Sequence, residues 1–145
     1  MSEYQKIRVS VRSICIVDNK ILLQTDLNDS VPTYATVGGE LESGETMEER
    51  LKLEYKEETG MDIEIKKYLF VIENFFLYND KPLHSLEHFF LVNIASTEFS
   101  SKEKHLSFHW IPVEEIEKYE IKPKVLKELI LKGELDEHKH LISRG

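Results

Sequence analysis

The chain alternates between short apolar segments and polar segments rich in breakers, which predicts strands separated by helices. Residues 7–17 begin with alternating apolar positions and become continuously apolar, a pattern typical of a strand entering a core. A polar turn at residues 18–20 and a second apolar run at 21–24 predict a hairpin. Further strands are expected over residues 34–37, 62–78, 85–95 and 106–111.

Two segments have the composition of helices. Good helix formers dominate residues 46–59, and Gly60 is a natural C-terminal stop. Pro123 suits the first turn of a final helix that ends near Leu131. The apolar face of this helix is expected to contain Val125, Leu126, Leu129 and Ile130.

Strands interrupted by a central helix and followed by a second helix predict a mixed sheet with helices on both faces. The long strand at residues 62–78 is expected to kink or bulge near Glu73 and Asn74. The tail after residue 133 is polar and is expected at the periphery, where Leu135 and Leu141 could anchor it.

Composition narrows the function classes. A chain of 145 residues with 41% hydrophobic content fits one domain, residues 1–145. The net charge of −8 argues against nonspecific nucleic-acid binding, which needs a basic surface. No apolar run reaches the length of a membrane span, no signal-peptide core begins the chain, and the single cysteine, Cys15, is expected to be buried. A cytoplasmic protein is therefore expected.

Acidic charge is concentrated in residues 38–61. Eight glutamates there face three basic residues, a local balance of −5. Glu54, Glu57 and Glu58 fall on one helical face, where like charges repel unless a cation offsets them. Such oxygen-rich sites suit Mg²⁺ or Mn²⁺, and the preceding Gly38-Gly39 pair allows backbone to approach a ligand. The alternative is a solvated acidic helix face.

This stretch resembles the signature of the Nudix hydrolases, Gly-x5-Glu-x7-Arg-Glu-U-x-Glu-Glu-x-Gly-U, in which U is a bulky apolar residue. Eight of its nine fixed positions are filled in register by Gly39, Glu45, Glu54, Tyr55, Glu57, Glu58, Gly60 and Met61. The resemblance covers essentially the whole chain and implies an α/β/α sandwich with a mixed β-sheet. It also implies an enzyme that hydrolyses the pyrophosphate bond of a nucleoside diphosphate linked to another group.

One fixed position departs from the signature, because Leu53 stands where the family has an arginine that orients the catalytic glutamates. Arg50 occupies a position where the family usually has a small apolar residue, one turn earlier and four residues before Glu54. We expect Arg50 to supply the missing guanidinium while Leu53 packs in place of the small residue. The alternative is that Arg50 is a solvated surface residue and the site is weakened.

The resemblance also implies roles for the other acids. Glu54, Glu57 and Glu58 become metal ligands, one of which could assist the attacking water, and the carbonyl of Gly38 is a further ligand. Glu45 becomes a supporting residue. An acid outside the signature often joins the site in this family, and Glu87 is the candidate because it interrupts an apolar strand. The alternative is that Glu87 occupies an outward-facing position of its strand and has no role in the site.

The substrate is less determined by the sequence. A base could stack on Tyr34, Phe75, Phe76 or Tyr78, although strand aromatics are more often core residues. ADP-ribose or a related nucleotide is expected from the family, and an RNA cap is disfavoured by the acidic surface. The alternative function is a nucleotide-binding regulator weakened by the loss of the arginine. Many relatives are dimers, so a homodimer is expected.

Overall fold

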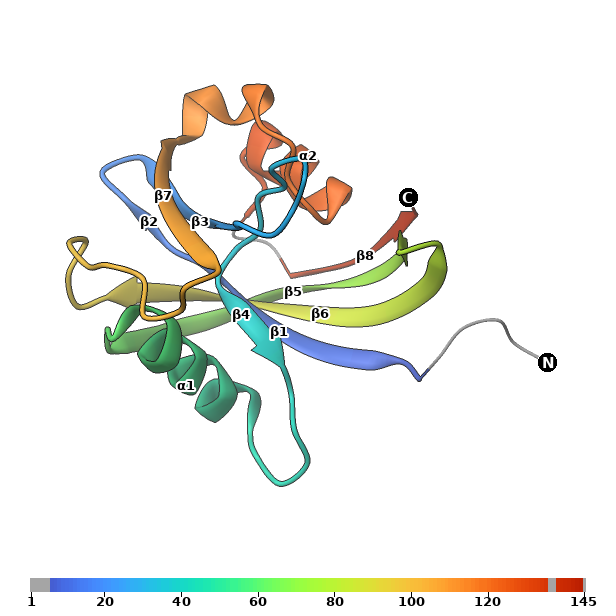
Figure 1. The fold of residues 1–145 in the computed structure, drawn as a ribbon, viewed down its shortest axis with the longest axis horizontal. Helices are drawn as coiled ribbons and strands as arrows, with labels where there is room; N and C mark the ends of the chain where they lie inside the picture. The colour runs from blue at the N-terminus through green and yellow to red at the C-terminus, as the bar shows by residue number, and fades with distance from the viewer. Residues whose placement is uncertain (1–5, 136–137, 145) are drawn as a thin grey trace.

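The computed structural model describes residues 6–135 and 138–144. Two sheets make up its β-structure (Figure 1). The strands of the larger sheet are β1 Arg8–Ile14, β4 Gly38–Glu40, β5 Ile63–Tyr78, β6 Lys81–Ile94 and β8 Lys139–Arg144. Those of the smaller sheet are β2 Ile16–Val17, β3 Lys20–Asp26 and β7 Leu106–Pro112. The helices are α1 Met47–Thr59, the 3-10 helix η1 Val113–Lys118 and α2 Lys124–Lys132.

The larger sheet is mixed and has the strand order β4-β1-β6-β5-β8. Its central strands β1 and β6 run parallel, β5 and β6 form a long antiparallel hairpin, and β8 runs parallel to β5. The smaller sheet, in the order β2-β3-β7, is antiparallel. Helix α1 lies on one face of the larger sheet, and α2 lies on the other (Figure 1). The predicted mixed sheet with helices on both faces is confirmed.

Each face of the larger sheet has its own apolar core. Beneath α1, Leu51 and Tyr55 pack with Val11, Val37 and Phe90. On the α2 side, a larger cluster joins the sheet to the helix and to the smaller sheet, and it includes Ile14, Ile21, Leu23, Phe70, Ile72, Phe89, Ile111, Leu126, Leu129 and Ile130. No helix within the described ranges is long and apolar enough to cross a membrane.

Two local predictions about strands were wrong. The strand expected over residues 34–37 instead begins at Gly38, because Gly38 and Gly39 allow the chain to lie close against β1, whereas Tyr34 and Ala35 make only isolated bridges. The bulge expected near Glu73 lies earlier, at the register shifts between residues 65 and 70.

The tail was also predicted incorrectly in part. Leu135 and Leu141 pack against the core as expected, but residues 139–144 form the edge strand β8. In this strand Ser143 is the buried position, and its neighbours are exposed or half-buried. An edge strand with little apolar alternation gives a weak sequence signal, which explains why the polar tail did not predict it.

Candidate functional site

Helix α1 is fixed at both ends by local interactions. The Thr46 hydroxyl accepts a hydrogen bond from the Glu49 amide at 3.1 Å, and the Glu49 carboxylate accepts one from the Thr46 amide at 2.9 Å. This capping box satisfies two amide groups at the helix start. Gly60 ends the helix with φ of 75°, a left-handed conformation that glycine adopts without strain. The glutamates of α1 are therefore held on a defined helical frame.

The glycine pair brings backbone directly against a signature carboxylate. A Cβ atom at Gly39 would lie 2.1 Å from Oε1 of Glu54, and one at Gly38 would lie 2.2 Å from the carbonyl oxygen of Val11. The clash at Gly38 is with backbone, so no side chain fits there, whereas a side chain at Gly39 would push the Glu54 carboxylate out of its place. The glycines are thus required where β4 passes between β1 and helix α1.

The three glutamates of the helical face differ in burial. Glu57 is exposed, the Glu54 side chain is 16% exposed, and Glu58 is buried. Desolvation, with the nearby charge of Glu54 as the second cause, raises the pKa of Glu58 to about 8. Desolvation also raises the pKa of Glu54, against the opposing effect of Arg50. Oε2 of Glu58 has no hydrogen-bond partner among the described residues.

The carboxylates of Glu54, Glu57 and Glu58 have the chemistry of ligands for a divalent cation. They offer hard oxygen donors, and a buried carboxylate oxygen without a partner is costly unless a cation compensates it. As the side chains lie, no three or more His, Cys, Asp or Glu within the described ranges come together to hold an ion. Glu54 instead accepts a hydrogen bond from Arg50. The donor set fits Mg²⁺ or Mn²⁺, and the metal roles of these residues and of the Gly38 carbonyl stay predictions.

Arg50 is buried and connects the glutamate face to the loop before the helix. Its Nε donates to Oε1 of Glu45 at 2.6 Å, and its Nη2 donates to Oε2 at 3.0 Å. Its Nη1 donates to Oε1 of Glu54 at 3.1 Å. The hydrogen bonds to Arg50 lower the pKa of Glu45. Arg50 is therefore not a solvated surface residue, and it contacts both signature glutamates that the expected role requires.

The expectation for Leu53 was wrong. Its side chain does not pack in place of a small residue but is 41% exposed. Position 53 lies on a part of α1 that faces solvent, whereas Leu51 and Tyr55 carry the contacts with the sheet. The departure at position 53 thus leaves an exposed apolar residue, and Arg50 makes the ion pairs.

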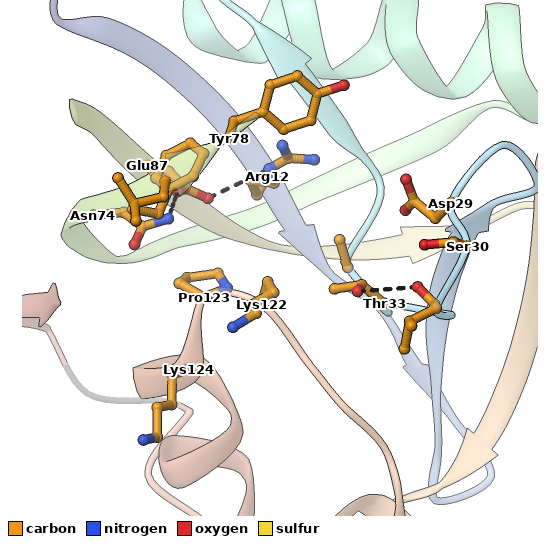
Figure 2. A pocket seen from close by; sticks show the side chains of 14 residues that line it. Arg12, Asp29, Ser30, Thr33, Asn74, Tyr78, Glu87, Lys122, Pro123 and Lys124 are labelled. Atoms are coloured by element: carbon orange, nitrogen blue, oxygen red, sulfur yellow. Dashed lines mark hydrogen bonds and ion pairs between the residues drawn. The ribbon is translucent and has the colours of Figure 1, made fainter. Parts of the chain in front are cut away.

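A pocket of about 410 Å³ opens on the α2 side of the larger sheet (Figure 2). Segments distant in sequence line it: the loop after β3, the β5–β6 hairpin, β1 and the start of α2. Arg12 and Glu87 meet on one side, with Lys122 and Pro123 facing them across the space (Figure 2). Exposed Leu77 and Tyr78 form part of the rim. Polar and charged side chains share the wall with apolar ones such as Val31, Phe76 and Leu77, so the pocket suits a small molecule that has both polar and apolar parts.

Glu87 is not an outward-facing strand residue, because it is only 5% exposed. Its Oε2 accepts hydrogen bonds from Nδ2 of Asn74 at 2.7 Å and from Oγ of Ser85 at 2.9 Å. Its Oε1 lies 3.6 Å from Nε of Arg12. Glu87 therefore belongs to a buried polar network in the pocket wall, and its role as a metal ligand stays a prediction.

The aromatic residues predicted to bind substrate are separated by the fold. Phe76 lines the pocket. Phe75, its neighbour on β5, stacks on His84 at 4.2 Å between ring centroids, with Arg144 over its ring. Tyr34 packs edge-on against His109 and Tyr119 within the core cluster. Phe76 is the one of the three that the described structure places at the pocket.

The histidines that flank Glu87 in the sequence do not join it in the described part of the structure. His84 lies near Glu73 and Phe75, and His88 contacts Tyr68. Strand alternation places both on the sheet face opposite Glu87. His138 contacts the backbone oxygen of Tyr68, and His140 contacts the Glu73 carboxylate.

Reasoning from the sequence did not identify Arg12, Asn74 or Lys122 as pocket residues. Arg12 and Asn74 each interrupt an apolar strand with a polar side chain, and this signal could have identified them, as it did Glu87. Lys122 lies in a loop and carries no comparable signal. Only the fold brings these three positions together.

Comparison with known structures gives the fold. A NUDIX hydrolase from Nitrosomonas europaea has a TM-score of 0.72 at 18% identity, covering 91% of this chain and 93% of that one. An ADP-ribose pyrophosphatase from Streptococcus suis has a TM-score of 0.67 at 17% identity, covering 95% and 100%.

Sequence comparison gives the family. A stretch of 51 residues is 43% identical to the NAD-capped RNA hydrolase NudC of Vibrio atlanticus (strain LGP32). This stretch covers 35% of the chain and 19% of NudC, so the chain spans about a fifth of that relative's length. Residues 6–130 match the model of the NUDIX domain. Because this match covers most of the chain, the protein belongs to the Nudix hydrolases, a family of pyrophosphohydrolase enzymes.

Proposed function

We propose that this Nudix hydrolase cleaves the pyrophosphate bond of a nucleoside diphosphate derivative, using Mg²⁺ or Mn²⁺ held by Glu54, Glu57, Glu58 and the Gly38 carbonyl. The observation that carries the proposal is the buried Glu58 oxygen without a partner on the signature helix. Nudix enzymes generally use divalent metal ions. A bound divalent ion supplies charge neutralisation at the phosphates and lowers the pKa of a coordinated water.

The residues of the chain have distinct tasks in this proposal. Glu57 is exposed, so it is accessible to solvent and to substrate. Arg50 holds Glu54 in place, and Glu45 fixes Arg50 through two hydrogen bonds. Gly39 leaves the space that the Glu54 carboxylate occupies. Glu87 stays a predicted further ligand.

We infer that the pocket takes the nucleoside part of the substrate. Its volume of about 410 Å³ lies in the range of small-molecule sites, and Phe76 and Tyr78 supply apolar contact surface. ADP-ribose is the first candidate, which the fold similarity to an ADP-ribose pyrophosphatase supports. A capped RNA fits less well, because the net charge of −8 opposes binding of a polyanion.

Release of phosphate or nucleoside monophosphate from a nucleotide panel, with and without Mg²⁺, tests the proposal. The panel should include ADP-ribose, nucleoside triphosphates, a dinucleoside polyphosphate and a sugar nucleotide. We expect Mg²⁺-dependent turnover that Glu57→Gln abolishes. Glu48→Gln is the matched control, because Glu48 is an exposed residue in the first turn of the same helix. Binding without metal-dependent turnover of any compound would favour the alternative of a nucleotide-binding regulator.

A further inference from the structure

Arg12 lies in the pocket wall, next to the strand that carries the glycine pair. It belongs to β1, lines the pocket, and is paired in register with Gly38 of β4. Gly39, the next residue of β4, lies against the Glu54 side chain, because a Cβ added there would be 2.1 Å from Oε1 of Glu54. Arg12 is thus a cation of the pocket wall, and its register partner Gly38 adjoins the residue that lies against Glu54.

The Arg12 guanidinium is oriented by buried groups. Nε faces Oε1 of Glu87 at 3.6 Å (Figure 2). Nη1 donates to the carbonyl of Thr36 at 3.2 Å. Glu87 is itself fixed by Asn74 and Ser85. The Arg12 side chain is 24% exposed, and its contacts with the described residues leave Nη2 available to a ligand. Because the side chain is already held in one orientation, it loses little conformational entropy when it binds a ligand.

A nucleotide that spans the two sites must pass this guanidinium. With its nucleoside in the pocket and its pyrophosphate at Glu54, Glu57 and Glu58, the phosphate nearer the nucleoside lies beside Arg12. The planar fork of arginine matches phosphate oxygens in a way that lysine does not. We propose that Arg12 binds the nucleoside-side phosphate of the substrate and that Glu87 is the residue that positions Arg12, a proposal that rests on the proposed function.

The contacts of Glu87 favour this positioning role over metal binding. Its Oε2 already accepts two hydrogen bonds, and its Oε1 faces Arg12. A metal ion at Oε1 would have to displace the guanidinium or place two cations side by side. Glu87 therefore acts on the substrate through Arg12, and its effect should appear in phosphate binding before it appears in metal binding.

Calorimetric titration with methylenediphosphonate, a non-hydrolysable pyrophosphate analogue, in the presence of Mg²⁺ tests the role of Arg12. The Arg12→Ala variant loses one or two charge-assisted hydrogen bonds to the analogue, so it should bind the analogue about 10- to 100-fold more weakly than wild type does. Arg12→Lys should bind the analogue more tightly than Arg12→Ala. If Arg12→Ala fails to fold, the comparison of Arg12→Lys with Arg12→Gln tests the same role. Arg8→Ala, an exposed arginine on the same strand and face, should bind like the wild type.

Glu87→Gln separates positioning from metal binding, because glutamine keeps the size and can accept from Asn74 and Ser85 but loses the charge that holds Arg12. We expect weaker methylenediphosphonate binding and a KM for the nucleotide raised about tenfold, with Mn²⁺ affinity within about twofold of wild type. Tenfold weaker Mn²⁺ binding with unchanged diphosphonate affinity would overturn the assignment. If wild type binds the analogue and Arg12→Ala binds it equally, this inference alone is wrong, whereas no binding by wild type overturns the proposed function as well.

Discussion

Arg50→Ala is the most informative single change in the signature helix. Arg50 is the cation that contacts Glu54 directly, at 3.1 Å, and it also makes two hydrogen bonds to Glu45. Alanine keeps the helix propensity of the position but removes the guanidinium. The variant therefore tests whether an arginine one turn before its family position performs the same task.

The structure predicts that Arg50→Ala affects stability and activity to different extents. The Arg50–Glu54 hydrogen bond joins two charged side chains that are only 9% and 16% exposed, so its loss should lower the free energy of unfolding by about 1.5 to 3 kcal/mol. Without Arg50, the Glu54 carboxylate loses its anchor beside Gly39 and is repelled by Glu57. A misplacement of about 1 Å in a catalytic group costs about 10²-fold in rate. We therefore expect about a hundredfold loss of kcat and a Tm that is lower by several degrees, with the variant still folded at the assay temperature.

Steady-state hydrolysis of the best substrate from the panel, at saturating Mg²⁺, measures kcat and KM for each variant. Arg50→Lys should retain the charge but lose the paired hydrogen bonds to Glu45, and an intermediate kcat is expected. Lys52→Ala is the matched control, because Lys52 is an exposed cation on the same helix. If Arg50→Ala keeps kcat within about threefold of wild type while Glu57→Gln abolishes turnover, Arg50 has no orienting role.

The double variant Arg50→Ala/Leu53→Arg restores the family arrangement. Leu53 is exposed, so an arginine there meets no steric barrier in the core. We expect the second change to recover a measurable part of the lost kcat, whereas Leu53→Arg alone should alter kcat little. Absence of any recovery would mean that the two positions are not equivalent on this helix.

Two further substitutions and the chemistry of Cys15 give the remaining predictions. Gly39→Ala places a Cβ 2.1 Å from Glu54 Oε1 and should lower kcat at least as much as Arg50→Ala, as measured in the same assay. Glu58→Gln removes a buried carboxylate without a partner, so the metal-free variant should melt no lower than wild type, whereas Mg²⁺ should raise the Tm of wild type only. Burial raises the pKa of the Cys15 thiol to about 11, so at pH 8 iodoacetamide should label the native protein about 100-fold more slowly than the urea-unfolded protein. Because the unfolded thiol loses its proton first, the contribution of Cys15 to stability should fall as pH rises from about 9 to about 11.

The parts of the fold that depend on strong local signals could be predicted from sequence. Helix α1 has helix formers, a capping threonine and a terminal glycine, and it lies within one residue of its predicted bounds. The hairpin turn at residues 18–20 was predicted from its polar residues, and Asp18 and Asn19 indeed have positive φ. Strand β8 could not be predicted, because its pairing with β5 depends on backbone contacts across the fold rather than on an apolar pattern.

The site was predictable only where it is continuous in sequence. The glutamates and glycines of residues 38–61 carry a spacing that the sequence displays directly. The pocket combines β1, the β5–β6 hairpin and the start of α2, and no local pattern records that these segments meet. Phe75 and Phe76 illustrate the limit, since adjacent strand residues must face opposite sides and the sequence did not indicate which one faces the pocket.

The two arginines explain how this chain tolerates its cluster of acids while departing from the family signature. Arg50 contacts Glu54 directly, and Arg12 acts on Glu54 and Glu58 through space from the pocket side. Neither residue is the arginine of the signature, yet both reduce the repulsion that three carboxylates on one helical face would otherwise produce. Because the charge balance of the face is maintained by other residues, the leucine at position 53 is not by itself evidence that catalysis has been lost.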